Sequence, residues 1–164
     1  MFDDLVRQQA EELLQAYREA GKKIVTAESC TGGLIAGSLT EIAGSSDVVD
    51  RGFVTYSNAA KTEMLGVSPA LLEHPGPGAV SAEVAVAMAK GALKASQADV
   101  AVSATGIAGP GGGSADKPVG LVFLGVAAKG GHARALRHVF PGDRGEVRHA
   151  TVRAALDLFK EVLG

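Results

Sequence analysis

The sequence predicts an α/β fold in which helices cover both faces of a mixed, mostly parallel sheet of about five strands. Segments with apolar residues at helical spacing alternate with short apolar runs through the first two-thirds of the chain, a pattern typical of helices packed on a sheet. The last two apolar runs are separated only by a short turn at residues 129–131. Because parallel strands need a longer crossover, at least this pair is expected to be antiparallel.

Five segments carry apolar side chains on one helical face and are expected to form helices: residues 2–17, 32–44, 58–67, 82–93 and 144–162. Gly21 and Gly66 lie where glycine commonly closes a helix. Ser81 is expected to cap the fourth helix, and Asp143 the fifth, with Glu146 three residues on in a capping-box arrangement. The inner stripe of the last helix is expected to consist of Val147, Thr151, Ala154, Leu158 and Val162.

Five apolar runs are expected to form strands: residues 22–27, 48–57, 98–106, 119–128 and 132–140. The run at 98–106 is almost continuously apolar, as in a strand buried on both faces. Residues 68–80, which contain three prolines, and the glycine-rich residues 106–118 are expected to be loops. No linker divides the chain, and 164 residues suit one domain, which we expect to span residues 1–164.

Composition excludes several classes of function. The net charge is −2, and no basic stripe with interleaved aromatic residues is present, so nucleic-acid binding is not expected. One cysteine allows no internal disulfide, which fits a reducing compartment. The first residues are acidic, unlike those of a signal peptide, and no apolar run approaches the ~18–20 residues of a membrane span. We expect a cytoplasmic protein without a membrane partner.

Three polar segments follow predicted strands, at the sheet edge where α/β proteins bind ligands: residues 28–33 (ESCTGG), 55–61 (TYSNAAK) and 104–118. In the first, a helix beginning around Thr31 or Gly32 would direct its free N–H groups and positive dipole end at the site. Such a corner can hold an oxyanion or a phosphate, and glycines at 32 and 33 let the backbone come close. The alternative is an ordinary strand-to-helix turn with a hydroxyl cap.

The second segment places a phenol beside an amine. With Ser57 as the N-cap of the short helix, Tyr56 is N′ and Lys61 is N4, two positions that are neighbours in space. If Lys61 is partly buried, its pKa falls and the amine can act as a base. The alternative is a tyrosine ring packed on the lysine stem, with the ammonium in water.

The third segment lacks the GxxxxGK[ST] order, so it is not a nucleotide P-loop. It is expected to cover the substrate or cradle a phosphate, and the alternative is a flexible connection. Thr105, at the end of a buried strand, can reach into the same corner. The four histidines have no matching cluster of cysteines or carboxylates, so no metal site is expected, and no Ser-His-Asp triad is evident.

Five motifs are similar in order to those of the C-terminal domain of the CinA (competence/damage-inducible) family: TAESCTGGLIAGSLTEIAGSS, RGFVTYSNAAKTEMLGV, GAVSAEVAVAMAKGAL, SATGIAGPGGGSADKPVGLVFLGVA and FPGDRGEVRHATV. The likeness runs from about residue 5 to 160. That family includes stand-alone nicotinamide-nucleotide amidases. The resemblance implies a three-layer α/β/α domain that hydrolyses nicotinamide mononucleotide to nicotinic acid mononucleotide and ammonia, in pyridine-nucleotide salvage.

The resemblance also assigns roles to residues. The family's nucleophile falls on Ser29, and its tyrosine and lysine fall on Tyr56 and Lys61. We expect Lys61 to take the hydroxyl proton while Tyr56 relays it or orients the lysine. The residues expected to stabilise the oxyanion or bind substrate are Cys30, Thr31, Gly32, Gly33, Thr105, Gly106, Gly109 and Arg144. No cofactor is expected, and the substrate is a small pyridine nucleotide.

Two alternatives remain open at this point. Cys30 rivals Ser29, because a thiol at a helix N-terminus has a lowered pKa, although no histidine is placed to pair with it. The domain is alternatively a non-catalytic nucleotide-binding or regulatory module that retains the family fold. For the substrate phosphate, Arg51 is a weaker candidate than Arg144 or the backbone of residues 106–114. We also expect the chain to form a homo-oligomer, a dimer or larger.

Overall fold

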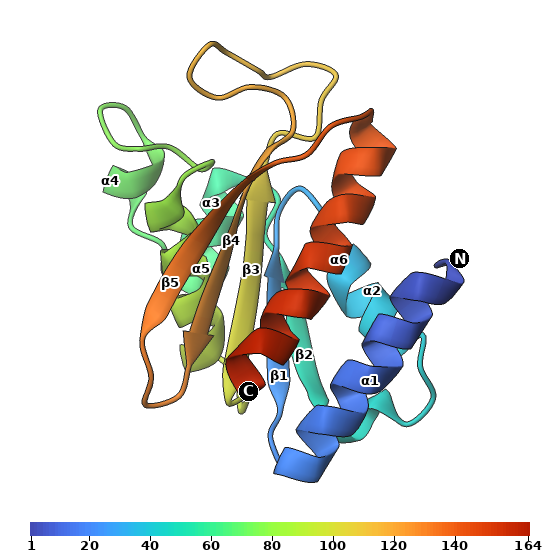
Figure 1. The fold of residues 1–164 in the computed structure, drawn as a ribbon. Helices are drawn as coiled ribbons and strands as arrows, with labels where there is room; N and C mark the ends of the chain where they lie inside the picture. The colour runs from blue at the N-terminus through green and yellow to red at the C-terminus, as the bar shows by residue number, and fades with distance from the viewer.

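The computed structural model describes residues 1–164 as one five-stranded sheet between two layers of helices (Figure 1). The strands lie in the order β2-β1-β3-β4-β5, with bounds β1 Ile24–Glu28, β2 Val49–Val54, β3 Val100–Gly106, β4 Leu121–Ala128 and β5 Ala133–Val139. The helices are α1 Asp4–Ala20, α2 Leu34–Thr40, α3 Asn58–Leu65, α4 Pro69–Leu72, α5 Ala82–Lys94 and α6 Arg144–Leu163, with a 3-10 turn at Ser45–Asp47.

The sheet is mixed, as predicted. β1 pairs in parallel with β2 and β3, whereas β4 pairs antiparallel with both β3 and β5. Strands β2, β1, β3 and β5 therefore run one way and β4 alone runs the other. The carboxyl ends of β1, β2 and β3 meet at one edge, where ligands gather in sheets of this kind.

Each face of the sheet has its own apolar core. Helices α1, α2 and α6 cover one face, and α3, α4 and α5 cover the other (Figure 1). Alternate residues of β3 divide between the cores: Val100 and Val102 pack on the α6 side, and Ala101 packs on the α5 side. This burial on both faces explains the continuous apolar run at residues 98–106 and confirms the three-layer α/β/α arrangement.

Most of the predicted helix ends are confirmed by their hydrogen bonds. The side chain of Ser81 accepts from the N–H of Val84, and Gly21 and Gly66 close their helices in the left-handed region, at φ of 65° and 68°. Asp143 and Glu146 form the complete capping box of α6. These signals therefore located the starts of α5 and α6 and the ends of α1 and α3.

Three details of the predicted helices were wrong. The second helix is shorter at both ends: α2 begins at Leu34, after Gly33 at a φ of 98°, and ends at Thr40. The loop at 68–80 contains the one-turn helix α4, which begins at Pro69, a residue well suited to a first helical turn. In α6, Ala154 and Val162 pack against the core but are only half-buried, and the predicted stripe omits four of the buried residues, which are Val147, Thr151, Val152, Ala155, Leu156, Leu158 and Phe159.

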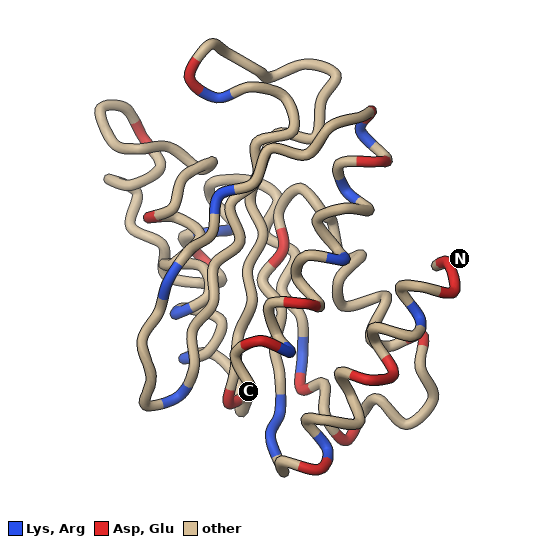
Figure 2. The backbone as a smooth tube through the Cα atoms, viewed as in Figure 1, with Lys and Arg blue, Asp and Glu red and all other residues tan.

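Figure 2 shows basic residues along β5, the open edge of the sheet. Arg134 and Arg137 of this strand are exposed. Charged side chains at such an edge disfavour pairing with the edge strand of another chain. Separately, none of the helices combines the length and the apolar character needed to cross a membrane.

Candidate active site

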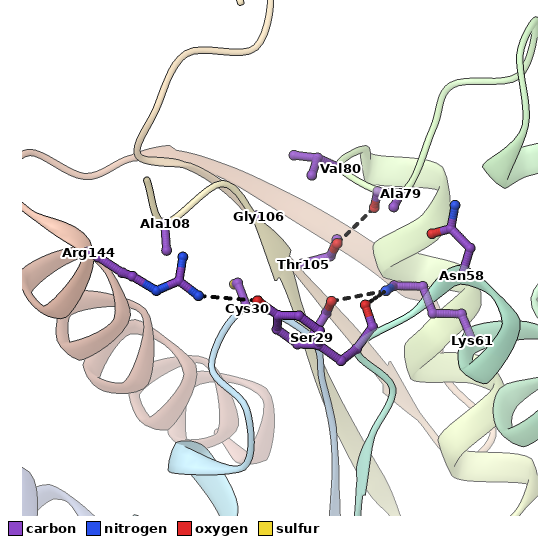
Figure 3. A pocket seen from close by; sticks show the side chains of 11 residues that line it. Ser29, Cys30, Asn58, Lys61, Ala79, Val80, Thr105, Gly106, Ala108 and Arg144 are labelled. Atoms are coloured by element: carbon purple, nitrogen blue, oxygen red, sulfur yellow. Dashed lines mark hydrogen bonds between the residues drawn. The ribbon is translucent and has the colours of Figure 1, made fainter. Parts of the chain in front are cut away.

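A pocket of about 210 Å³ lies at the carboxyl ends of the central strands (Figure 3). It brings together the three polar segments that the sequence singled out, along with residues from the loop before α5 and the start of α6. The lining residues are Ser29, Cys30, Tyr56, Asn58, Lys61, Ala79, Val80, Thr105, Gly106, Ala108 and Arg144.

At the base of the pocket, the hydroxyl of Ser29 faces the amine of Lys61 (Figure 3). Ser29 is the first residue after β1, and its N–H donates to the carbonyl oxygen of Ala104 on β3, at 2.9 Å. Lys61 is the fourth residue of α3, which follows β2. The distance between Ser29 Oγ and Lys61 Nζ is 3.0 Å, within direct proton-transfer range.

The Lys61 side chain is buried, being only 1% exposed. Its Nζ also lies 2.9 Å from the carbonyl oxygen of Thr55 and 3.3 Å from that of Tyr56, and no ion pair includes it. Burial lowers the pKa of Lys61 from its ordinary value, because the charged form loses hydration without gaining a carboxylate. The burial expected of a basic lysine is therefore confirmed.

The three neighbours of Lys61 Nζ match the hydrogen-bonding capacity of a neutral amine. Such an amine has two hydrogens and one lone pair. The two carbonyl oxygens can only accept, so they take both hydrogens, and the lone pair then faces the hydroxyl of Ser29; the ammonium form donates to all three oxygens, Ser29 Oγ included. The geometry thus suits deprotonation of a hydroxyl by a lysine.

Tyr56 contributes its backbone, not its phenol, to this arrangement. The side chain is 62% exposed, and its hydroxyl accepts a hydrogen bond from Arg144 Nη2 at 3.2 Å. No hydrogen bond joins the phenol to Lys61 or Ser29. The expected proton relay through the phenol therefore has no path here, and it is the Tyr56 carbonyl that orients the amine.

Cys30 lines the pocket but lacks the character of an activated thiol. It is 7% exposed, and burial raises its pKa to about 11. The argument for Cys30 as a rival nucleophile, a pKa lowered by a helix N-terminus, therefore fails: burial dominates, and α2 begins four residues later. A thiolate is therefore scarce at neutral pH.

The N-terminus of α2 does not open onto the pocket, which corrects the prediction. The N–H groups of Ile35 and Ala36 donate to the two carboxylate oxygens of the buried Glu28, at 2.9 and 3.0 Å. The N–H of Gly32 donates to the carbonyl oxygen of Ser29 at 3.0 Å. Thr31, Gly32 and Gly33 are all absent from the pocket lining. The N–H of Cys30, by contrast, donates to no other residue, and only its own thiol is within reach as an acceptor.

The remaining predicted residues divide between the pocket and its surroundings. Thr105 and Gly106 line the pocket, and Thr105 Oγ1 donates to the carbonyl oxygen of Ala79 at 2.8 Å. Gly109 lies outside the lining, and its carbonyl accepts from Arg144 Nη1 at 2.9 Å. Arg51, the weaker candidate for the substrate phosphate, does not line the pocket. It binds Asp50 and the carbonyl oxygen of Ala95 instead.

Sequence reasoning missed several residues around the site. Asn58, the first residue of α3, was within a quoted motif but received no role. Ala79 and Val80 reach the pocket because α5 begins directly after them, and nothing in their local sequence marks them. Glu28 and Arg148 act on the turn after β1 and were not singled out. No three His, Cys, Asp or Glu side chains gather as a metal-binding group.

Comparison with known proteins agrees with the motifs. Residues 6–163 match the CinA C-terminal domain. The chain is 50% identical over 165 residues to the nicotinamide-nucleotide amidohydrolase PncC of Escherichia coli K12, covering 99% of this chain and 98% of that protein. It is 51% identical over 159 residues to a CinA-like protein of Mycolicibacterium vanbaalenii, covering 97% of this chain but only 36% of that longer relative. This chain likewise covers only 36% of the length of a relative from Caldicellulosiruptor saccharolyticus.

The fold is shared with a solved structure. The competence/damage inducible protein CihA from Agrobacterium tumefaciens superposes with a TM-score of 0.96 at 50% identity, covering 100% of this chain and 99% of that one. The likeness thus extends over the whole sheet and both helical layers.

Proposed function

The chain belongs to the CinA C-terminal domain family, and from this premise we propose that it is a nicotinamide-nucleotide amidohydrolase. The reaction is hydrolysis of the carboxamide of nicotinamide mononucleotide, giving nicotinic acid mononucleotide and ammonia. The near full-length likeness to a protein of that name supports the substrate. The observation that carries the chemistry is the buried pair of Ser29 and Lys61, 3.0 Å apart.

In the first half of the proposed reaction, Ser29 Oγ attacks the carboxamide carbon while neutral Lys61 takes the hydroxyl proton. The carbonyl oxygen becomes an oxyanion, and we assign its stabilisation to the N–H of Cys30, a residue of the pocket lining whose N–H donates to no other residue. One well-aimed donor contributes roughly 3–4 kcal/mol to the transition state. Lys61 then passes its proton to the leaving nitrogen, so ammonia departs and an acyl-enzyme ester remains on Ser29.

In the second half, water attacks the ester carbon and Lys61 takes one of its protons. The tetrahedral intermediate collapses, and the proton returns to Ser29 Oγ as the acid is released. Every step is assigned to a protein group or to water. Lys61 serves as base and acid in turn, a cycle that favours a lysine with a lowered pKa.

We place the substrate phosphate at the mouth of the pocket, near Arg144. This side chain is exposed at the first position of α6, and it spans from the Gly109 carbonyl to the Tyr56 hydroxyl. Arginine suits phosphate because its fork of N–H donors matches the phosphate oxygens. The N–H groups of Ala108 and Gly109, in the loop that Arg144 contacts, donate to no other backbone group, and we assign them as further donors to the phosphate.

The proposed function is tested by measuring ammonia release from nicotinamide mononucleotide in the presence of EDTA. We expect release at a rate that saturates with substrate and does not change when EDTA is added, because no step uses a metal. Absence of release above background would favour a nucleotide-binding module instead. Release that EDTA abolishes would indicate metal-dependent chemistry.

A further inference from the structure

Arg148 binds the backbone of the turn that carries Ser29. It lies one helical turn beyond Arg144 on α6 and is half-buried. Its Nε donates to the carbonyl oxygen of Cys30 at 3.0 Å, and its Nη2 donates to that of Thr31 at 3.3 Å. The guanidinium forms no ion pair, so its partners are two main-chain carbonyls.

The turn is shaped to receive this guanidinium. Gly32 has a φ of 57°, and a side-chain carbon there would lie 3.3 Å from Arg148 Nη2. The bare backbone of Gly32 therefore leaves room for the arginine to approach. At the other end of the turn, the carboxylate of Glu28 holds the first N–H groups of α2.

Two linked peptide planes connect Arg148 to the N–H of Cys30. In a trans peptide the N–H points away from the carbonyl of the same plane. Arg148 Nη2 donates to the carbonyl oxygen of Thr31, which lies in the same peptide plane as the N–H of Gly32. That N–H donates to the carbonyl oxygen of Ser29. The Ser29 carbonyl shares its plane with the Cys30 N–H. The carbonyl of Cys30 itself is held by Arg148 Nε.

We propose that Arg148 is a positioning residue for the acyl-transfer step, which holds the Cys30 N–H toward the developing oxyanion. This inference rests on the proposed amide hydrolysis at Ser29. It gives different roles to two arginines that lie four residues apart on α6. Arg144 lines the pocket, whereas Arg148 lies outside the lining and acts through the turn after β1.

The expected signature is a loss of kcat without a loss of substrate binding. The oxyanion exists only in the transition state, so misaligning its donor lowers kcat and leaves KM nearly unchanged. Arg148→Met is expected to lower kcat by about 10- to 100-fold, less than complete loss of a donor. Arg148→Lys is expected to be similarly impaired, because an ammonium cannot reproduce the fork that binds both carbonyls.

Arg153→Met is the matched control, since this exposed arginine lies on the same helix and contacts Gln9 at the surface. It is expected to keep the parental kcat and KM. Added guanidinium ion is expected to restore part of the kcat of Arg148→Ala, whereas methylammonium is not. Thermal melts of each variant show whether it is folded. If Arg148→Met is unfolded, the kcat and KM of Arg148→Lys decide the test.

A second readout does not depend on the substrate. A serine-directed fluorophosphonate places its P=O oxygen where the oxyanion forms, so its rate of labelling Ser29 is expected to fall about tenfold or more in Arg148→Met. If the parental protein labels in this way but does not deamidate the nucleotide, the substrate proposal fails and the positioning role stands. Parental kcat and labelling rates in a folded Arg148→Met, or a raised KM with unchanged kcat, would overturn the role of Arg148.

Discussion

Lys61 has no carboxylate partner, although it is buried beside a hydroxyl and two carbonyls. A buried ammonium without a counter-charge is costly, and the group relieves that cost by losing its proton. The pKa of Lys61 is accordingly lowered from its ordinary 10.5. A base that is neutral at a lower pH than other lysines is what a serine nucleophile requires.

The activity is therefore expected to rise with pH as Lys61 loses its proton. In the free enzyme, kcat/KM for nicotinamide mononucleotide should increase tenfold per pH unit below the lowered pKa and level off above it. The plateau should be reached below pH 10.5. Measuring kcat/KM across pH gives this profile, and Lys61→Met should remove both the activity and its dependence on pH.

The pH dependence of the free energy of unfolding tests the lowered pKa of Lys61 without measuring activity. Between the lowered pKa in the fold and 10.5, the unfolded lysine binds a proton that the folded lysine does not. Stability should therefore rise with pH through that window, and be lost as the pH falls through it. In Lys61→Met this contribution disappears. A kcat/KM profile without an ascending limb, in a parental protein that is folded throughout, would contradict the role of Lys61.

Ser29 and Cys30 show what residue types alone could not decide. Their hydroxyl and thiol groups are adjacent at the same turn, and a helix N-terminus beside them was the argument for Cys30 as a rival to Ser29. The structure buries Cys30, which raises its pKa to about 11, and directs the lysine to the serine. Burial depends on packing between distant segments, so the sequence could favour Ser29 only through the Tyr56/Lys61 pair and the family resemblance.

At the scale of elements, the turn between β1 and α2 is built to hold the nucleophile. Glu28 is fully buried and occupies the N-terminus of α2, which would otherwise be free to bind an anion. Of the motif ESCTGG only Ser29 and Cys30 line the pocket, and its glutamate caps α2 instead. Nothing in the local sequence shows that the carboxylate of Glu28, one residue before Ser29, accepts from the first N–H groups of α2.

The contact between α3 and α5 sets the position of Lys61. A side-chain carbon at Gly91 of α5 would overlap the backbone carbonyl of Leu65, the last residue of α3. Alanine is a better helix former than glycine by about 1 kcal/mol, but the overlap is with backbone, which cannot move aside. Gly91→Ala is therefore expected to destabilise the fold by about 1–3 kcal/mol, measured as a Tm lower by about 2–4 °C per kcal/mol.

The same substitution is expected to lower kcat, because α3 is displaced and Lys61 moves with it. Lys90→Ala is the control, since this neighbouring residue on α5 is exposed and its loss should leave stability within about 0.5 kcal/mol. A higher Tm in Gly91→Ala, with unchanged kcat, would show that helix propensity outweighs the contact and that α3 is not fixed in this way.

At the scale of the whole molecule, the sheet topology explains why the site could be located in advance. The apolar runs and the short turn at 129–131 predicted a mixed sheet, and the parallel order β2-β1-β3 brings the ends of three strands together. The polar segments that follow those strands were therefore expected to meet, and they do.

The parts of the site that escaped prediction come from elements that pack around this edge. Ala79 and Val80 arrive through the loop before α5, and Arg148 arrives on α6, more than 110 residues after the turn it binds. Their positions follow from how the two helical layers pack on the sheet, which local patterns do not encode. The expected homo-oligomer stays a prediction at this scale.

The most direct test of the central claim compares Ser29→Ala with Cys30→Ala in the hydrolysis of nicotinamide mononucleotide. The buried Ser29–Lys61 pair predicts that Ser29→Ala lowers kcat/KM by about 10³-fold or more, whereas Cys30→Ala retains most of the parental activity. Ammonia release under identical conditions measures both, with thermal melts to confirm that each variant is folded. Parental activity in Ser29→Ala, together with its loss in Cys30→Ala, would contradict the assignment of Ser29 as the nucleophile.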